Sequence, residues 1–340
     1  MNGKKLHFGI IGAGRIGHVH AETLAFRLPE AEIAAIADLN GEAAQALAAR
    51  CNIPKVAASA DEIFADPRIE AVLICTPTDT HADLIVRAAR AGKHIFCEKP
   101  VALSLKRIDS SLAAAEAAGV QLQVGFNRRF DSNFIRVRNA VASGEIGTPN
   151  LMHIVSRDPA PPPISYLRAS GGIFLDMTIH DFDMARYLMG DEVEEVYTAG
   201  GVMVDPAFKD ENDLDTALVV LHFRGGAIGT IDNSRKATFG YDQRVEILGS
   251  KGKIATENRY PNQVVVSSDK SVYTDLPLNF FMQRYAESFA LELQLFVRAV
   301  LEGKPTPVTG ADSRVPVAMA LAARKSYDEH RPVKLIEVSA

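Results

Sequence analysis

The sequence lacks several features that identify large classes of proteins. It contains no Trp, three Cys and 17 Pro in 340 residues. No run approaches the roughly 18 to 20 uncharged apolar residues that a membrane helix needs, and the apolar run after Lys5 is too short for a signal-peptide core. With 47% hydrophobic and 23% charged residues, the composition is typical of about two globular domains of roughly 150 residues each. We therefore expect a cytoplasmic protein without a membrane partner.

The numbers of cysteine and basic residues argue against two further classes, metal-binding or redox proteins with C-x-x-C sites and nucleic-acid-binding proteins. Cys51, Cys75 and Cys97 are odd in number and lack C-x-x-C spacing, so we predict reduced thiols and no metal site. Lys and Arg total 37 against 42 Asp and Glu, a net charge of −5, whereas nucleic-acid binders usually carry clustered excess Lys and Arg. We therefore predict no nucleic-acid partner.

The first part of the chain alternates short apolar runs with amphipathic helical stretches. Predicted strands cover residues 6–11, 33–38, 71–75, 94–97 and 121–124, and predicted helices end near residue 27 and cover 42–50, 81–90 and 104–118. The run at 71–75 is almost wholly apolar, as in a parallel strand that helices cover on both faces. This alternation predicts an α/β fold, a doubly wound parallel sheet, which we place at residues 1–124.

The pattern changes after Gly125. Predicted strands cover 151–157, 193–204, 214–223, 226–234, 243–249 and 263–275, and predicted helices cover about 131–142, 178–189, 280–302 and 311–330. Hairpin signals at 224–226 and 249–252 predict a large, mostly antiparallel, open sheet in an α+β domain at residues 125–340. Because such a sheet often covers its second face with another subunit, we predict a homo-oligomer, a dimer or tetramer, formed through the open sheet.

A glycine-rich hexapeptide lies between the first predicted strand and the first predicted helix. Gly12-Ala13-Gly14-Arg15-Ile16-Gly17 has the form G-x-G-x-x-G, in which the glycines permit a tight turn, the approach of a pyrophosphate and close helix packing. Asp38 ends the second strand, where a carboxylate accepts hydrogen bonds from the adenosine ribose and repels a 2′-phosphate. We predict a Rossmann domain that binds NAD in preference to NADP, through Gly12, Gly14, Arg15, Ile16, Gly17 and Asp38.

Two later loops also follow strands of the predicted parallel sheet. Nucleotides bind at the carboxyl edge of such sheets, so we add Thr76, Pro77, His81, Glu98 and Lys99 to the predicted cofactor-binding residues. A His at the start of a helix is more often a cap or packing residue. A Lys before Pro at a strand end is about equally often an ordinary surface cation.

Asp176 and His180 are four residues apart, so at positions i and i+4 of a helix they share one face. A carboxylate that holds one imidazole nitrogen leaves the other nitrogen toward a substrate hydroxyl and favours the protonated ring, which suits a general base. Asp183 lies on the same face. A surface Asp/His pair and a metal site are the alternatives, although no second cluster of metal ligands is evident.

Several motifs together resemble a known superfamily. Residues 12–17, Glu98-Lys99-Pro100 and 124–130 resemble the glucose-fructose oxidoreductase, inositol dehydrogenase and rhizopine-catabolism (Gfo/Idh/MocA) superfamily. Residues 170–187 are similar to the D-x-x-x-H helix of its inositol 2-dehydrogenase branch. The stretches 156–159, 237–242 and 281–285 extend the resemblance over essentially the whole chain.

The resemblance implies roles for individual residues. Lys99 is implied to be catalytic, with a commonly cis Lys99–Pro100 bond, and Asp176 is implied to be the partner of His180. In this mechanism His180 is the general base, Asp176 orients it, and Lys99 stabilises the developing charge on the substrate oxygen. The residues implied to bind a polyol substrate are Lys99, Asn127, Arg128, Arg157, Asp158, Asp176, His180, Tyr241 and Tyr285.

We therefore predict an NAD-dependent inositol 2-dehydrogenase activity that converts myo-inositol to 2-keto-myo-inositol (scyllo-inosose). Three groups of alternatives remain open. In the first group, the protein is a related dehydrogenase whose substrate is scyllo-inositol, an aldose such as glucose, or a modified inositol. In the second group, the chain is a non-catalytic dinucleotide-binding redox sensor. In the third group, it is a structural oligomer without a ligand.

Overall fold

The computed structural model describes residues 4–339, apart from the side chains of residues 168 and 169. The chain forms two compact units. The first ends at Phe130 and also includes Glu287–Val317, and the second consists of Asp131–Ala286 and Ala318–Ala340. Our prediction of one boundary between residues 124 and 125 differs from this division, because a late segment belongs to the first unit.

The first unit contains the predicted parallel sheet, with the strand order β2-β1-β3-β4-β5. Its strands are β1 (Leu6–Ile11), β2 (Ala31–Ala37), β3 (Ala71–Ile74), β4 (His94–Glu98) and β5 (Leu122–Gly125). All neighbouring strands are parallel. Every residue of β3 is buried, as its continuous apolar sequence predicted.

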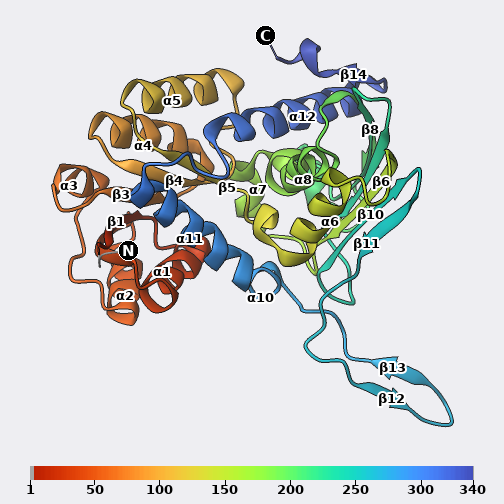
Figure 1. Ribbon diagram of the computed structural model, residues 1–340, viewed down its shortest axis with the longest axis horizontal. Helices are drawn as coiled ribbons and strands as arrows, with labels where there is room; N and C mark the ends of the chain where they lie inside the picture. The colour runs from red at the N-terminus through yellow and green to blue at the C-terminus, as the bar shows by residue number, and fades with distance from the viewer. Residues whose placement is uncertain (1–3, 340) are drawn as a thin grey trace. The chain divides into compact units, whose positions relative to one another are not determined.

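Helices cover both faces of this sheet, which confirms the doubly wound fold. They are α1 (Arg15–Arg27), α2 (Gly41–Cys51), α3 (Ala60–Ala65), α4 (Thr78–Arg90) and α5 (Leu105–Ala117). In Figure 1, α4 and α5 lie together on one side, and α1 and α2 lie on the other. Of these helices, α3 was not predicted. The side chain of Asn40 caps α2 by accepting a hydrogen bond from Ala43, and left-handed Asn52 ends it.

The first unit also takes α11 (Ala286–Glu302), a helix that we had placed in the second domain. Leu293, Phe296 and Val297 of α11 belong to the same buried cluster as Phe8 of β1 and Phe96 of β4. The ring centroid of Phe296 lies 6.1 Å from that of Phe8 and 5.8 Å from that of Phe96. The apolar face of α11 therefore completes the core on one face of the parallel sheet.

The second unit contains a seven-stranded sheet with the order β11-β10-β6-β9-β8-β7-β14. Its strands are β6 (Pro149–Arg157), β7 (Val193–Gly201), β8 (Thr216–Phe223), β9 (Ile228–Ser234), β10 (Asp242–Gly249), β11 (Gly252–Thr256) and β14 (Val333–Lys334). All neighbours are antiparallel except β6 and β9. This confirms a mostly antiparallel sheet. Its parallel pair, and the strands β11 and β14, were not predicted.

The helices of the second unit are α6 (Ser132–Ala142), α7 (Ile164–Ser170), α8 (Ile179–Met189), α9 (Ala207–Asp210) and α10 (Phe281–Arg284). The second unit also contains α12 (Gly310–Glu329) from Ala318 onward, whereas the first residues of α12 belong to the first unit. The predicted strand at 263–275 is instead a separate hairpin of β12 (Val265–Ser267) and β13 (Val272–Thr274), which projects from its unit in Figure 1. The predicted helix at 280–302 is interrupted at Tyr285, between α10 and α11. Within residues 4–339, no helix combines the length and hydropathy needed to cross a bilayer.

The three cysteines are free and buried. Burial raises the pKa values of the Cys75 and Cys97 thiols well above their ordinary value. These thiols are therefore packing residues, protonated near neutral pH, and not nucleophiles.

Candidate active site

The predicted cofactor residues of the first unit gather at one edge of its parallel sheet. Because all five strands run the same way, their carboxyl ends meet at this edge. The glycine loop follows β1, Asp38 follows β2, Thr76 follows β3 and Lys99 follows β4. The strand order reverses between β1 and β3, which is where open α/β sheets bind nucleotides.

The three glycines of the hexapeptide have different surroundings. Gly12 has a φ of 109°, and a Cβ there would lie 2.5 Å from the carbonyl oxygen of Cys75. A Cβ at Gly17 would overlap the carbonyl oxygen of Gly12, whereas a Cβ at Gly14 would meet no atom within 4 Å. Gly14 is the N-cap residue of α1. The exposed amino end of α1 therefore faces open space, which fits a pyrophosphate.

Asp38 is held beside the glycine loop by two backbone hydrogen bonds. Its Oδ2 accepts from the amide of Ala13 at 2.6 Å, and its Oδ1 accepts from the amide of Asn40 at 2.7 Å. A carboxylate oxygen has two lone pairs, so each oxygen keeps acceptor capacity for a ribose hydroxyl. Arg15 is exposed and Ile16 is partly buried at the start of α1.

His81 contacts the backbone of two loops. The ring is 1% exposed, with Nδ1 2.8 Å from the carbonyl oxygen of Pro100 and Nε2 2.8 Å from that of Thr76. Burial lowers the pKa of His81, although both carbonyl contacts act in the opposite direction. Thr76 also shares a 2.6 Å hydroxyl hydrogen bond with Thr80, and Pro77 is exposed. His81 thus connects the loop that contains Thr76 with the loop that contains Pro100, beside the proposed nucleotide site.

Lys99 lies in a tight segment that we call the Lys99 turn, Glu98-Lys99-Pro100. The Lys99–Pro100 bond is cis, as the resemblance implied, and Lys99 is partly exposed. Glu98 is buried and its Oε1 lies 2.6 Å from Nε2 of His20. Asn127 and Arg128 follow β5 in a short 3₁₀ helix (Asn127–Phe130), and both are buried.

In the second unit, Asp176 and His180 lie on different kinds of helix. Asp176 is within a π-helical turn (Phe174–Thr178), and His180 is in the first turn of α8. We had predicted one regular α-helical face, so the wider π turn changes the spacing between the two side chains. Single π turns occur frequently at functional sites. Both residues are partly exposed.

Two residues that the sequence did not indicate hold Asp176. Its Oδ2 lies 2.9 Å from Nη2 of Arg235, and its Oδ1 accepts a 2.8 Å hydrogen bond from the hydroxyl of Tyr166. Arg235 is 2% exposed, and its Nη1 lies 3.5 Å from Oδ2 of Asp158. Burial opposes the charge of this guanidinium, but Asp176 and Asp158 outweigh burial and raise the pKa of Arg235.

The site around Asp176 is thus a buried cation between two carboxylates. The available sequence signal was weak: Arg235 directly follows β9, and Tyr166 lies in a short helix that we did not predict. In the described part of the chain, no group of three or more His, Cys, Asp and Glu residues is arranged to hold a metal ion.

Tyr241 and Tyr285, both implied by the resemblance, lie together. Their ring centroids are 6.1 Å apart and nearly perpendicular, and both side chains are buried. The guanidinium of Arg284 lies 4.6 Å from the centroid of Tyr285 and forms a buried ion pair with Asp131. This cation and the T-shaped ring contact fix the position of both rings.

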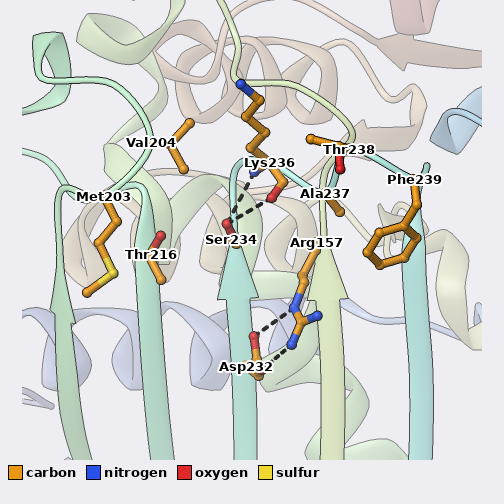
Figure 2. Close-up of a pocket in the computed structure, with 10 residues that line it drawn as sticks. All are labelled: Arg157, Met203, Val204, Thr216, Asp232, Ser234, Lys236, Ala237, Thr238 and Phe239. Carbon is orange, nitrogen blue, oxygen red and sulfur yellow. Dashed lines mark hydrogen bonds and ion pairs between the residues drawn. The ribbon is translucent and has the colours of Figure 1, made fainter.

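Arg157 lines a pocket of about 520 Å³ in the second unit (Figure 2). The Nε of Arg157 donates to Asp232 at 3.0 Å, a second bond joins its Nη2 to the same carboxylate, and Nη1 lies 3.4 Å from Asp242. Of the residues implied to bind substrate, Arg157 alone is among the pocket's ten lining residues. Its donors bind carboxylates of neighbouring strands.

Comparisons with known proteins identify the family of this chain. Residues 6–126 match the GFO_IDH_MocA model, described as an oxidoreductase family with an NAD-binding Rossmann fold, and residues 134–255 match the GFO/IDH/MocA C-terminal domain. The chain is 46% identical to a myo-inositol 2-dehydrogenase of Thermotoga maritima, covering 98% of this chain and 99% of that protein. It is 45% identical to an inositol 2-dehydrogenase of Rhizobium meliloti, covering 97% and 99%.

A solved structure extends the comparison. The scyllo-inositol dehydrogenase of Lactobacillus casei, with bound NAD(H) and scyllo-inositol, matches with a TM-score of 0.92 and 28% identity, covering 98% of this chain and 100% of that one. The glycine loop, Asp38 and the open space at Gly14 are what an NAD-binding edge requires. The chain therefore belongs to the GFO/IDH/MocA oxidoreductase family, and it is an NAD-dependent oxidoreductase.

Proposed function

We propose that this protein oxidises a secondary hydroxyl of a cyclic polyol, converting myo-inositol to 2-keto-myo-inositol. Two relatives that are 46% and 45% identical over almost their full lengths are inositol 2-dehydrogenases, which supports this substrate class. The structural observation that carries the proposal is the anchoring of the Asp176 carboxylate. Arg235 and Tyr166 hold its two oxygens in place, four residues before His180.

Each proposed catalytic side chain has one task. His180 removes the proton of the substrate hydroxyl as general base, and the Asp176 carboxylate favours the protonated imidazole that results. The ammonium group of Lys99 hydrogen-bonds the same oxygen and stabilises its developing negative charge. NAD, when bound, supplies the hydride acceptor.

Recognition of a polyol requires many hydrogen-bonding groups around the ring. We propose that Asn127, Arg128, Asp158, Tyr241 and Tyr285 contribute them. We also keep Arg157 as a proposed substrate residue, although it binds Asp232 in the described structure. The Lactobacillus casei relative binds scyllo-inositol, so this stereoisomer is the first rival substrate.

The experiment is an NADH-absorbance screen of the purified protein with NAD or NADP against myo-inositol, scyllo-inositol, other inositols and aldoses. We expect the highest kcat/KM with NAD and myo-inositol. Preferred turnover of scyllo-inositol or glucose would replace the substrate assignment. Absence of NADH formation with every polyol would favour the redox-sensor alternative.

The same assay tests His180. We expect His180→Ala to lower kcat by about 10²- to 10⁴-fold, the usual contribution of a general base. The dissociation constant for NADH, measured by fluorescence, should change little. An unchanged kcat would remove His180 from the mechanism.

A further inference from the structure

Two buried histidines lie on either side of the Lys99 turn. His20, which is 0% exposed, comes from α1 and contacts Glu98. His81, which is 1% exposed, comes from α4 and contacts Pro100. The residue before Lys99 and the residue after it are therefore each held by an imidazole. The roles assigned above use neither ring for proton transfer.

In the hydrogen bond between His20 and Glu98, the imidazole is the donor and the carboxylate is the acceptor. A carboxylate accepts hydrogen bonds, so Nε2 of His20 carries the proton that bridges the 2.6 Å to Oε1. Among the described residues, Nδ1 of His20 has no hydrogen-bond partner. The rings of Phe96 and Phe289 lie edge-on to the imidazole at 5.2 and 5.6 Å. These contacts fix the imidazole plane and hence the direction of its donor.

The Glu98 carboxylate also lies close to the backbone of β5. A Cβ added to Gly125 would lie 3.0 Å from Oε1 of Glu98, closer than ordinary side-chain contacts. The carboxylate of buried Glu98 therefore packs against both His20 and a strand position that has no side chain. These close contacts limit the movement of Glu98, the residue before Lys99.

His81 holds the other end of the turn. Pro100 has no backbone N–H, so its carbonyl is its only polar backbone group. That carbonyl lies 2.8 Å from Nδ1 of His81, and the carbonyl of Thr76 lies 2.8 Å from Nε2. A neutral imidazole has one N–H, so it donates to one of the two carbonyls at a time.

The two histidines connect the Lys99 turn to the proposed nucleotide loops. The helix α1 begins at the glycine loop, and α4 begins directly after Thr76 and Pro77. We propose that His20 and His81 are positioning residues that set Lys99 relative to these loops, His20 through the Glu98 carboxylate and His81 by donating Nδ1–H to the Pro100 carbonyl. The inference rests on the role proposed above for Lys99.

Asparagine and glutamine variants test this proposal because their amide groups replace different imidazole nitrogens. An Asn amide reaches about as far as Nδ1, and a Gln amide about as far as Nε2. At position 20 we therefore expect Gln to retain the contact with Glu98 and Asn to lose it. At position 81 we expect the reverse, with Asn retaining the contact with Pro100.

We expect the Asn and Gln variants to rank in opposite order of kcat at positions 20 and 81. His20→Gln and His81→Asn should each have about tenfold higher kcat than His20→Asn and His81→Gln, respectively. Dissociation constants for NADH should differ by less than about threefold within each pair. The acetylation rate of Lys99 in the cofactor-free protein, followed by mass spectrometry, should change in the two variants that lose the contact, because this rate depends on the position of the amine.

His94 provides the control because it begins β4, at the opposite end of the strand from the Lys99 turn. Its Nδ1 accepts a hydrogen bond from the amide of Gln121. We expect His94→Asn and His94→Gln to alter the melting temperature without altering kcat or the acetylation of Lys99.

Two results would overturn the proposal. The first is that the Asn and Gln variants have equal kcat at both positions. The second is that the decrease in kcat among the variants is fully accounted for by their decrease in melting temperature. Lys99→Ala separates this proposal from the assigned role of Lys99. If Lys99→Ala retains wild-type kcat, the proposed role of Lys99 fails. If it loses kcat while the four histidine variants do not, the positioning role fails alone.

Discussion

At the scale of a single residue, we propose that Asp38 sets the preference for NAD over NADP. Its two oxygens accept hydrogen bonds from the amides of Ala13 and Asn40, so the negative charge stays beside the glycine loop. No basic residue immediately follows it, since Leu39 and Asn40 come next. A 2′-phosphate at this position would meet an anchored carboxylate, and neither of the next two residues supplies a cation.

We expect Asp38→Ala to raise the KM for NAD by about 10- to 100-fold, because hydrogen bonds to a charged group contribute about 1.5–3 kcal/mol. The preference for NAD over NADP should fall at the same time. Asp38→Asn is the matched control because it removes the charge and retains an acceptor oxygen. The measurement is kcat/KM with each dinucleotide, and an unchanged ratio in both variants would contradict the role of Asp38.

Arg235 shows what residue patterns alone did not reveal. Its spacing from His180 and the family resemblance together indicated Asp176, but the observed ion-pair partner of Asp176 lies in another element, directly after β9. No local periodicity links residues 176 and 235, because the contact exists only when β9 and the π turn pack in one unit. The same holds for Tyr166.

At the scale of elements, the glycine loop and α1 form one structural unit. Gly17 packs against the backbone of Gly12, whereas Gly14 faces open space. These two glycines therefore have different tasks, one in helix packing and one in leaving room for a ligand.

Alanine substitutions separate the two tasks. Gly17→Ala should lower both the melting temperature and the affinity for NADH, because its Cβ would overlap a backbone carbonyl. Gly14→Ala should leave the melting temperature of the cofactor-free protein within a few degrees and weaken NADH binding by at least about tenfold. Thermal unfolding and NADH fluorescence titration measure the two effects. Tight NADH binding by Gly14→Ala would show that pyrophosphate does not approach this residue.

The loop before α9 depends on the buried carboxylate of Asp215. This side chain is 0% exposed and accepts hydrogen bonds from the amides of Met203, Val204 and Asp205 at 2.8, 2.7 and 3.0 Å. Burial raises the pKa of this carboxyl, but the three amides and the Thr216 hydroxyl outweigh burial and lower it below its ordinary value.

A lowered pKa in the folded state stabilises the protein above the unfolded-state pKa, and this contribution is lost as pH falls through the lower folded-state value. At about pH 7, we expect Asp215→Asn to reduce the free energy of unfolding by about 2 kcal/mol. The difference from wild type should shrink below about pH 3.8, the ordinary pKa. Urea unfolding across this pH range checks the trend, and a constant difference would exclude the carboxylate as its cause.

At the scale of the whole molecule, the second face of the seven-stranded sheet carries exposed apolar side chains. Along β8, buried Val219 and Leu221 alternate with exposed Leu218 and partly exposed Val220. Leu151 of β6 pairs in register with Leu248 of β10 and Ile228 of β9, and these three side chains are 40–45% exposed. A row of apolar side chains on the open face is typical of an interface between subunits.

We therefore propose a homo-oligomer, dimer or tetramer, through this face. Leu151→Glu should place charges in the interface and reduce the mass measured by light scattering, with little change in the secondary structure. Phe26→Glu, at an exposed apolar position of α1, is the control and should leave the mass unchanged. A monomeric wild-type protein would contradict the proposal, and an oligomer unaffected by Leu151→Glu would place the interface elsewhere.

Much of the architecture followed from the sequence by itself. The runs around β1 to β5 and α1 to α5, apart from α3, were predicted because their apolar periodicity is local. The glycine hexapeptide and Asp38 were also recognisable, because a strand, a turn and a helix in succession bring their ends to one sheet edge. The π turn at Asp176 was not predicted, since hydrogen-bond spacing within a helix leaves no clear mark in an apolar pattern.

Only the tertiary structure decided which elements pack together. The amphipathic pattern of α11 predicts a helix with one buried face, but not that Phe296 packs on Phe8 and Phe96 of the first sheet. In the same way, His20 and His81 show no sequence pattern that links them to Glu98 and Pro100. Local periodicity determines the elements, whereas such partners are chosen by burial and hydrogen bonding between segments that are distant in the chain.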